Sequence, residues 1–241
     1  MSLDPAGYKL LNRFQQLFEV AEYRHRVSNN GDLVASFLID DVLALGQSSK
    51  LADAASSGSS VLNSANRTTG KTHRRGDGTF GRVVPGAKLR TVPGYAVSFG
   101  QVANIEIGAE TKILAKAMIK QIDRVCTDMV NQAAEFRKHG NNPICVGIVG
   151  INHASMYRSL EKDREWITDG SSSYRHPIQE AEEAEKILRG RVVPQFDEVV
   201  FLRFKATNMH PLQFAWLNSE KTFHEYGAAL VRLAAQYQKR F

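Results

Sequence analysis

The pattern of apolar and polar positions predicts five amphipathic helices, the first two consecutive and the others alternating with strands. In the first segment, apolar side chains recur three or four positions apart, with Asp4 as the expected N-cap and Pro5 at the first helical position. Five segments show this spacing: residues 5–27, 32–46, 113–139, 177–188 and 219–238. The third is the clearest, because apolar side chains run along one face from Met118 to Phe136 and polar side chains occupy the other.

Strand-like segments lie between these helices. Residues 92–99 and 102–113 are separated by a Gly-Gln pair, which predicts a β-hairpin. Residues 144–151 and 199–204 are nearly unbroken apolar runs, which are typical of strands buried on both faces. A hairpin followed by a crossover helix and a buried strand gives a mixed sheet flanked by helices on both faces. We therefore expect an α/β fold in a single domain over residues 1–241.

The composition is that of an ordinary globular domain, with 241 residues, 43% hydrophobic and 23% charged. These values exclude collagen-like, coiled-coil and wholly disordered chains. No stretch of about 18 apolar residues is present, and the first residues lack a secretory pattern, so we expect no membrane association. Cys126 and Cys145 are the only cysteines. This excludes a disulfide scaffold and a four-cysteine zinc site, and it favours a reducing, cytoplasmic location.

The net charge of +6 comes from one part of the chain, residues 56–91. This Gly/Ser-rich segment holds seven Lys and Arg residues and a single acid, Asp77, whereas bases and acids balance elsewhere. A basic loop on a neutral body is typical of polyanion binding, and nucleic acid is the usual polyanion. The candidate DNA-contacting residues in this segment are Arg67, Lys71, His73, Arg74 and Arg75. The alternative is a solvated loop that binds no partner.

Residues 104–112 carry an unusual row of charged side chains. Because side chains alternate along a strand, Glu106, Glu110 and Lys112 are expected to share one face. Glu110 and Lys112 would lie about 6.6 Å apart along the strand, close enough to converge on one small ligand. A carboxylate there can hold Mg²⁺, and an ammonium can stabilise a phosphoryl charge. The alternative is an edge strand with a solvated polar face.

The order of hairpin, Glu-x-Lys strand, amphipathic helix and apolar strand resembles the core of the PD-(D/E)XK nuclease superfamily, which includes most type II restriction endonucleases. The matching parts are the Glu-Thr-Lys of residues 110–112, the helix 113–139 and the strand 144–151, all within residues 92–152. The resemblance implies a restriction-endonuclease-like fold and Mg²⁺-dependent hydrolysis of DNA phosphodiesters, with Mn²⁺ as a substitute. It also implies a homodimer, because a two-fold oligomer suits cleavage of both strands of a palindrome.

By this resemblance, Glu110 and the Thr111 carbonyl would hold the metal ion, and Lys112 would be the catalytic ammonium. The family's partner aspartate is missing from the preceding predicted strand, where a glycine follows the proline. Glu106 lies about 13 Å from Glu110 along the strand, which is too far for easy shared coordination, so it is an accessory candidate only. The other candidates for the second acid are Asp77, Glu19 and Glu22.

Two other interpretations stay open from the sequence. Lys116 and Lys120, spaced one helical turn apart, would contact phosphates, and the same scaffold without activity would be a DNA-binding protein. Residues 65–72 match a relaxed P-loop pattern, which would indicate a nucleotide-binding enzyme. A working P-loop follows a buried strand and opens a helix, and neither neighbouring segment has that pattern. The sequence therefore favours the nuclease.

Overall fold

The computed structural model describes residues 7–25, 30–63, 76–161 and 164–241. Its centre is a seven-stranded mixed sheet with the strand order β3-β1-β2-β4-β5-β8-β9. The strands of this sheet are β1 (Ser60–Asn63), β2 (Gly78–Val83), β3 (Phe99–Gly100), β4 (Val102–Leu114), β5 (Gly140–Asn152), β8 (Glu198–Ala206) and β9 (Phe214–Trp216). A separate two-stranded hairpin consists of β6 (Arg158–Glu161) and β7 (Arg164–Ile167).

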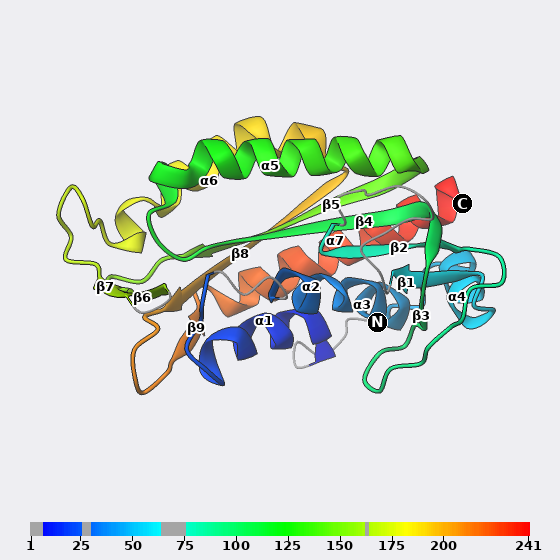
Figure 1. Cartoon of the computed structure of the whole chain (residues 1–241), viewed down its shortest axis with the longest axis horizontal. Coiled ribbons are helices and arrows are strands. Elements are labelled where there is room, and N and C mark those ends of the chain that lie inside the picture. Colours follow the sequence, from blue (N-terminus) through cyan, green and yellow to red (C-terminus); the bar gives the residue numbers. More distant parts are fainter. Residues whose placement is uncertain (1–6, 26–29, 64–75, 162–163) are drawn as a thin grey trace.

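Helices cover both faces of the sheet (Figure 1). The described helices are α1 (Lys9–Glu19), α2 (Asn30–Ala35), α3 (Phe37–Ala44), α4 (Ser49–Ser56), α5 (Met118–His139), α6 (Ala181–Arg191) and α7 (Ser219–Arg240), with 3-10 turns η2 (Pro177–Gln179) and η3 (Val193–Gln195). Helices α5 and α6 lie on one face, and α1, α3 and α7 lie on the other. The predicted α/β fold with a mixed sheet between helices is confirmed. None of the described helices is long and apolar enough to cross a membrane.

Strands β4, β5 and β8 form the parallel centre of the sheet, and α5 is the crossover from β4 to β5. The predicted buried strands 144–151 and 199–204 are therefore confirmed as β5 and β8. Apolar side chains on the α7 face pack around Phe14 and Tyr226, and those on the α5 face pack around Met129 and Phe136. This burial on both faces explains the unbroken apolar sequence of the two strands.

The helix predictions hold for the long helices and fail in detail near the N-terminus. Helix α1 ends at Glu19 rather than near residue 27, and the expected cap and proline at residues 4 and 5 lie outside the described residues. The predicted helix 32–46 is two helices, α2 and α3, which meet at Ser36. The Ser36 hydroxyl donates to the Asp32 carbonyl at 2.6 Å. This side-chain hydrogen bond to the backbone accompanies the break between them.

The predicted hairpin between residues 92–99 and 102–113 is wrong. The antiparallel partner of β4 is β2, and the short strand β3 pairs with β1 in parallel. Strands β1 and β2 both lie inside the Gly/Ser-rich window 56–91, which was expected to be a loop. Glycine is required within β2, because a Cβ on Gly81 would lie 2.1 Å from the Asn104 carbonyl oxygen on β4. The glycines that suggested a loop therefore permit a close strand contact.

A buried carboxylate fixes the start of α1. The Asp41 side chain, 2% exposed, accepts hydrogen bonds from the backbone N–H groups of Lys9 at 2.8 Å and Leu10 at 3.0 Å, and from the Tyr226 hydroxyl at 2.7 Å. Burial raises the pKa of Asp41 to about 6, although these hydrogen bonds act in the opposite direction. The first turn of α1 and the C-terminal helix α7 are thus joined through one ionisable group.

We expect the contribution of Asp41 to stability to decrease as the pH rises. Its pKa is higher in the folded protein than in the unfolded chain, so the folded state binds the extra proton between about pH 4 and pH 6. This contribution to the free energy of unfolding is fully present below about pH 4. It decreases by about 2 to 3 kcal/mol as the pH rises through about 6. Urea unfolding of the wild type and of Asp41→Asn at several pH values measures this difference. A difference that does not change with pH would contradict the assignment.

Candidate active site

Strand β4 continues beyond the strand that pairs with it. The last β2–β4 pair is Gly78 with Ala109, whereas β4 runs on to Leu114. Asp77 directly precedes β2, and continuing the register by one residue sets it opposite Glu110. The Thr111 N–H donates a hydrogen bond to Asp77 Oδ2 at 2.8 Å. Asp77, the single acid of residues 56–91, therefore lies beside the Glu-x-Lys segment of β4.

Glu110 and Lys112 share a face, as the alternation along the strand predicts. The ladder between β4 and β5 is regular from Ile107 to Leu114, so side chains alternate without interruption over this stretch. Lys112 Nζ lies 2.6 Å from Glu110 Oε1. The Glu110 side chain is 7% exposed, whereas the Lys112 side chain remains 23% exposed. The ammonium is therefore the more accessible member of this ion pair.

The prediction that Glu106 shares this face is wrong. Phe80 pairs with Ile107 and Gly81 pairs with Ile105, so Glu106 is the extra residue of a β-bulge. A bulge reverses the side-chain alternation. Glu106 consequently faces α7 and bonds to Tyr237, while a Cβ on Gly108 would meet Phe136 of α5.

Glu106 has structural partners on the α7 side. Its carboxylate is 1% exposed and accepts hydrogen bonds from the Ser60 hydroxyl at 2.9 Å and the Tyr237 hydroxyl at 2.6 Å. Arg82 Nε lies 2.8 Å from the other carboxylate oxygen. Burial, and then the hydrogen bond to Glu106, raise the pKa of Tyr237, so its hydroxyl keeps the proton that it donates. Glu106 is thus part of the sheet–helix packing and not an accessory acid of the site.

Glu19 and Glu22 are bound to other side chains. Glu19, at the end of α1, accepts hydrogen bonds from Gln15 at 3.0 Å. Glu22 forms an ion pair with Arg158 at 2.8 Å. Neither lines the cavity described below. Of the acids considered for the second position, Asp77 alone is brought next to the Glu-x-Lys segment.

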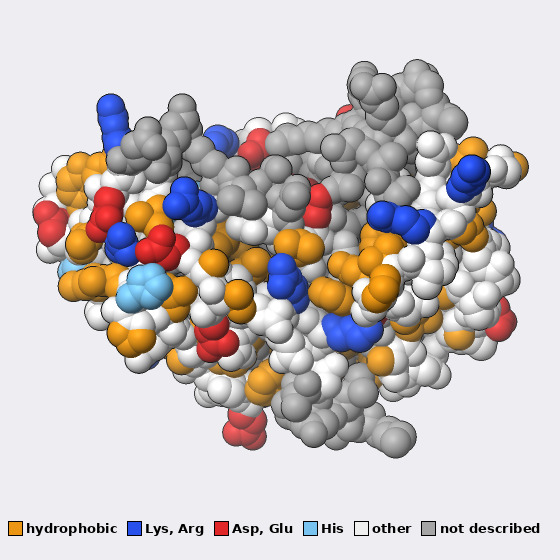
Figure 2. Space-filling view, turned by 60° about the horizontal axis from the view of Figure 1, so that its bottom comes forward, with side chains coloured by type: hydrophobic (Ala, Val, Ile, Leu, Met, Phe, Trp, Pro, Cys, Tyr) orange, Lys and Arg blue, Asp and Glu red, His pale blue; other side chains and the backbone are white. Residues whose placement is uncertain are grey.

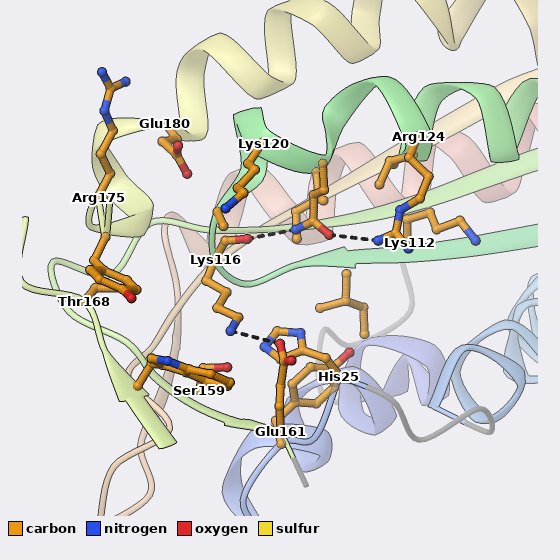
Figure 3. Close-up of a pocket in the computed structure, with 18 of the residues that line it drawn as sticks. His25, Lys112, Lys116, Lys120, Arg124, Ser159, Glu161, Thr168, Arg175 and Glu180 are labelled. Atoms are coloured by element: carbon orange, nitrogen blue, oxygen red, sulfur yellow. Dashed lines mark hydrogen bonds and ion pairs between the residues drawn. The ribbon is translucent and has the colours of Figure 1, made fainter. Parts of the chain in front are cut away.

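A cavity of about 790 Å³ opens beside the part of β4 that extends beyond β2 (Figure 3). Its walls are the end of β4, the start of α5, the β6–β7 hairpin and the segment around Asn30. The ionisable residues that line it are Tyr23, His25, Asp77, Lys112, Lys116, Lys120, Arg124, Asp128, Glu161, Tyr174, Arg175 and Glu180. Asp77 and Lys112 thus line the end of the cavity next to β4, although Glu110 itself does not line it, and Lys120, Arg124 and Asp128 line the α5 wall.

The two predicted phosphate contacts differ in their surroundings. Lys116 precedes α5, so it does not lie on the exposed helix face as predicted. Its ammonium pairs with Glu161 at 3.2 Å and lies 5.2 Å from the centre of the Trp166 ring. Lys120 lies in the first turn of α5 and lines the cavity. Lys120 is thus the better placed of the two for a phosphate.

The start of α5 is already occupied by a carboxylate. Glu180, between η2 and α6, accepts a hydrogen bond from the Met118 N–H at 2.7 Å. The Gln121 side chain donates to the Lys116 carbonyl at 2.8 Å. A negative charge at this end stabilises the helix dipole. Anion binding in the cavity would therefore depend on the basic side chains rather than on the helix terminus.

Three residues that line the cavity each have a buried polar atom with no hydrogen-bond partner among the described residues. These atoms are His25 Nε2, Thr111 Oγ1 and Ser159 Oγ. Burial, and then the charge of Lys116, lower the pKa of His25 to about 4, so its ring is neutral at neutral pH. His25 and Ser159 belong to segments that the sequence gave no reason to connect. A buried polar atom without a partner is costly, so a ligand or water is expected to bond to these atoms.

The remaining predicted DNA contacts cannot be compared with the site. Arg67, Lys71, His73, Arg74 and Arg75 all lie in residues 64–75, outside the described residues, as does the whole P-loop-like segment 65–72. On the face that Figure 2 shows, the described acidic and basic side chains are scattered among hydrophobic ones. The described part of that face therefore carries no patch of one charge.

The described residues contain no cluster of three or more His, Cys, Asp or Glu side chains that could hold a metal ion. The possible ligands at the site are the Asp77 and Glu110 carboxylates and the Thr111 carbonyl. In a strand, the N–H and C=O of one residue point to the same edge. Since the Thr111 N–H is directed to Asp77, its carbonyl is directed to the same side of β4. This small oxygen set suits Mg²⁺, which keeps several waters and uses one or two carboxylates.

No family model, curated protein or solved structure matches this chain. The function of the site is therefore inferred from its residues and their arrangement.

Proposed function

We propose that this protein is a divalent-metal-dependent deoxyribonuclease whose active site contains Asp77, Glu110 and Lys112. The observation that carries the proposal is the hydrogen bond from the Thr111 N–H to Asp77, at 2.8 Å. It places an acid from one strand beside a Glu-x-Lys sequence on its antiparallel neighbour. Helix α5 and the parallel strand β5 then follow, in the order that the resemblance to the PD-(D/E)XK nucleases implies.

The missing acid of the sequence pattern is explained by this arrangement. The family pattern expects an aspartate on the strand that precedes the Glu-x-Lys strand. That neighbour is β2 rather than residues 92–99, and Asp77 stands immediately before β2. A glycine occupies the position before Asp77, where a Cβ would lie 2.2 Å from the Phe136 ring. The ring of a proline at this position would clash with Phe136 in the same way. Glycine therefore precedes the aspartate here, where the family pattern has proline.

The carboxylates and the ammonium would have different tasks. Asp77, Glu110 and the Thr111 carbonyl would hold Mg²⁺, or Mn²⁺, which prefers the same oxygen ligands. The metal ion supplies a more acidic bound water and neutralises charge on the phosphate. The Lys112 ammonium, held by Glu110 at 2.6 Å, would donate to the attacked phosphate group and stabilise its growing negative charge.

DNA is the proposed substrate because basic residues line the cavity and also precede Asp77 in the sequence. Lys120 and Arg124 line the cavity on the α5 side. In the sequence, four bases and one histidine of residues 67–75 come directly before Gly76-Asp77. Contacts of this kind fix affinity and position on the phosphate backbone, and they become weaker as the salt concentration rises.

Cleavage of supercoiled plasmid tests the proposed function. The wild type is expected to convert it to nicked or linear DNA in Mg²⁺ or Mn²⁺ and to leave it intact in EDTA. Asp77→Asn is expected to abolish this conversion. Asp123→Asn is a matched control, because Asp123 lies on α5, does not line the cavity and pairs with Arg191 at the surface. Salt-sensitive retention of the plasmid without any cutting would contradict hydrolysis and favour a DNA-binding protein.

A further inference from the structure

The end of the cavity formed by the β6–β7 hairpin differs from the proposed catalytic end. Ser159 on β6 and Trp166 on β7 are directly paired across the hairpin, and both line the cavity. Side chains of paired residues lie on the same face of a hairpin. Ser159 is 1% exposed. Figure 3 shows Ser159 and Glu161 along one wall and Lys112 at the other end of the cavity.

The cation that contacts the Trp166 ring is already paired. The Lys116 ammonium is paired with Glu161 at 3.2 Å and lies near the Trp166 ring. His25, on the same side, is neutral at neutral pH because burial lowers its pKa to about 4. A phosphate next to Trp166 would therefore meet a Lys116 ammonium that is already paired and an uncharged His25 ring. The chemistry here suits a neutral, planar group that forms hydrogen bonds.

The unpartnered atoms supply those hydrogen bonds. Ser159 Oγ and His25 Nε2 are buried and have no partner among the described residues, and both side chains line the cavity. A hydroxyl can donate and accept, and a neutral imidazole nitrogen does one or the other according to its tautomer. The edge of a nucleobase carries both donors and acceptors. Trp166 adds an aromatic ring of the kind on which bases stack.

We propose that the hairpin end of the cavity binds one unpaired nucleobase of the DNA strand whose phosphate lies at Asp77, Glu110 and Lys112. This inference rests on the proposed function and adds a substrate class, single-stranded or overhanging DNA. The cavity volume of about 790 Å³ is in the range of small-molecule sites and can hold a nucleotide. A base inside an intact duplex would first have to leave its stack, which costs free energy that an unpaired base does not need.

Intrinsic fluorescence tests the pocket without any cleavage. The chain has two tryptophans, so Trp216→Phe leaves Trp166 as the single reporter. The probe is a four-nucleotide thymidine strand in EDTA, compared with a blunt DNA hairpin. We expect saturable quenching by the single strand and at least tenfold weaker binding of the hairpin. Unchanged fluorescence with the single strand, or equal binding of both probes, would overturn the pocket.

A second measurement avoids dependence on the Trp216→Phe background. Anisotropy of the labelled strand should show about tenfold weaker binding by Trp166→Ala. Trp166→Phe retains a stacking ring and should keep most of the wild-type affinity. Equal binding by Trp166→Ala and the wild type would overturn the pocket. Quenching without cleavage of any DNA would support the nucleobase pocket and contradict the proposed nuclease activity. If the protein cleaved blunt duplex DNA as fast as single-stranded DNA in the presence of metal, the nuclease activity would be supported and the nucleobase pocket contradicted.

Discussion

Lys112→Ala is expected to lower the rate of metal-dependent DNA cleavage by about 100-fold or more at saturating DNA. The ammonium is paired with Glu110 and remains partly accessible, and loss of a donor to the developing charge typically has an effect of this size. The measurement is the initial rate of nicking of supercoiled plasmid in Mg²⁺. Thermal unfolding of the same variant shows whether the loss reflects folding, since the substitution removes an ion pair of the buried Glu110 carboxylate.

Lys120→Ala is the matched control for this substitution. It removes one positive charge from the same cavity, on α5 rather than on β4. We expect weaker binding and a smaller dependence on salt, with the rate at saturating DNA close to that of the wild type. If Lys112→Ala cuts as fast as the wild type, or if both variants lose the same rate at saturation, Lys112 has no special part in the reaction.

Glu106→Ala is expected to destabilise the fold by about 3 kcal/mol without a specific effect on the reaction. The substitution leaves the buried hydroxyls of Ser60 and Tyr237 without their acceptor and removes the partner of Arg82. Arg82 is half-exposed and can be solvated, so the two hydroxyls account for most of the loss. Urea unfolding at neutral pH measures the change.

Glu19→Ala provides the comparison for Glu106. Its carboxylate bonds to Gln15 at the surface of α1, so its removal is expected to change stability by about 0.5 kcal/mol or less. Under conditions where Glu106→Ala remains folded, its cleavage rate should equal that of the wild type, with no altered dependence on metal concentration. A stable Glu106→Ala protein that has lost cleavage would instead make Glu106 an acid of the active site.

The central part of the fold follows directly from the sequence. The helix around Met118 to Phe136 and the apolar run 144–151 have patterns that only a helix-covered parallel centre satisfies. The C-terminal end of the last helix was also predicted to within two residues. Its N-cap is Asn218 rather than Ser219, because the Asn218 side chain accepts a hydrogen bond from the Lys221 N–H at 2.9 Å. These elements depend on local periodicity and burial.

The pairing of strands could not be obtained from local patterns. Residues 92–99 have more strand-like composition than β2, yet β2 is the partner of β4 because its glycines allow the backbones to approach. The bulge at Glu106 likewise depends on how Phe80 and Gly81 meet β4. A one-residue irregularity moved a charged side chain to the opposite face.

The candidate site was predicted in part. Glu110 and Lys112 were singled out by their spacing on one strand, and Asp77 was one of several acids considered. Only the register of β2 against β4 distinguishes Asp77 from Glu19, Glu22 and Glu106. Ser159 and Trp166 gave no signal, because residues 152–173 are polar and their hairpin becomes part of the cavity only through tertiary contacts.

A crystal soaked in Mn²⁺ tests the central claim most directly, because anomalous scattering locates the ion and so identifies its ligands. The account expects one Mn²⁺ bound by the Asp77 and Glu110 carboxylates and the Thr111 carbonyl, and no ion at this position in Asp77→Asn. Mn²⁺ bound only elsewhere on the chain, or bound equally well in Asp77→Asn, would contradict a metal-dependent active site at the end of β4.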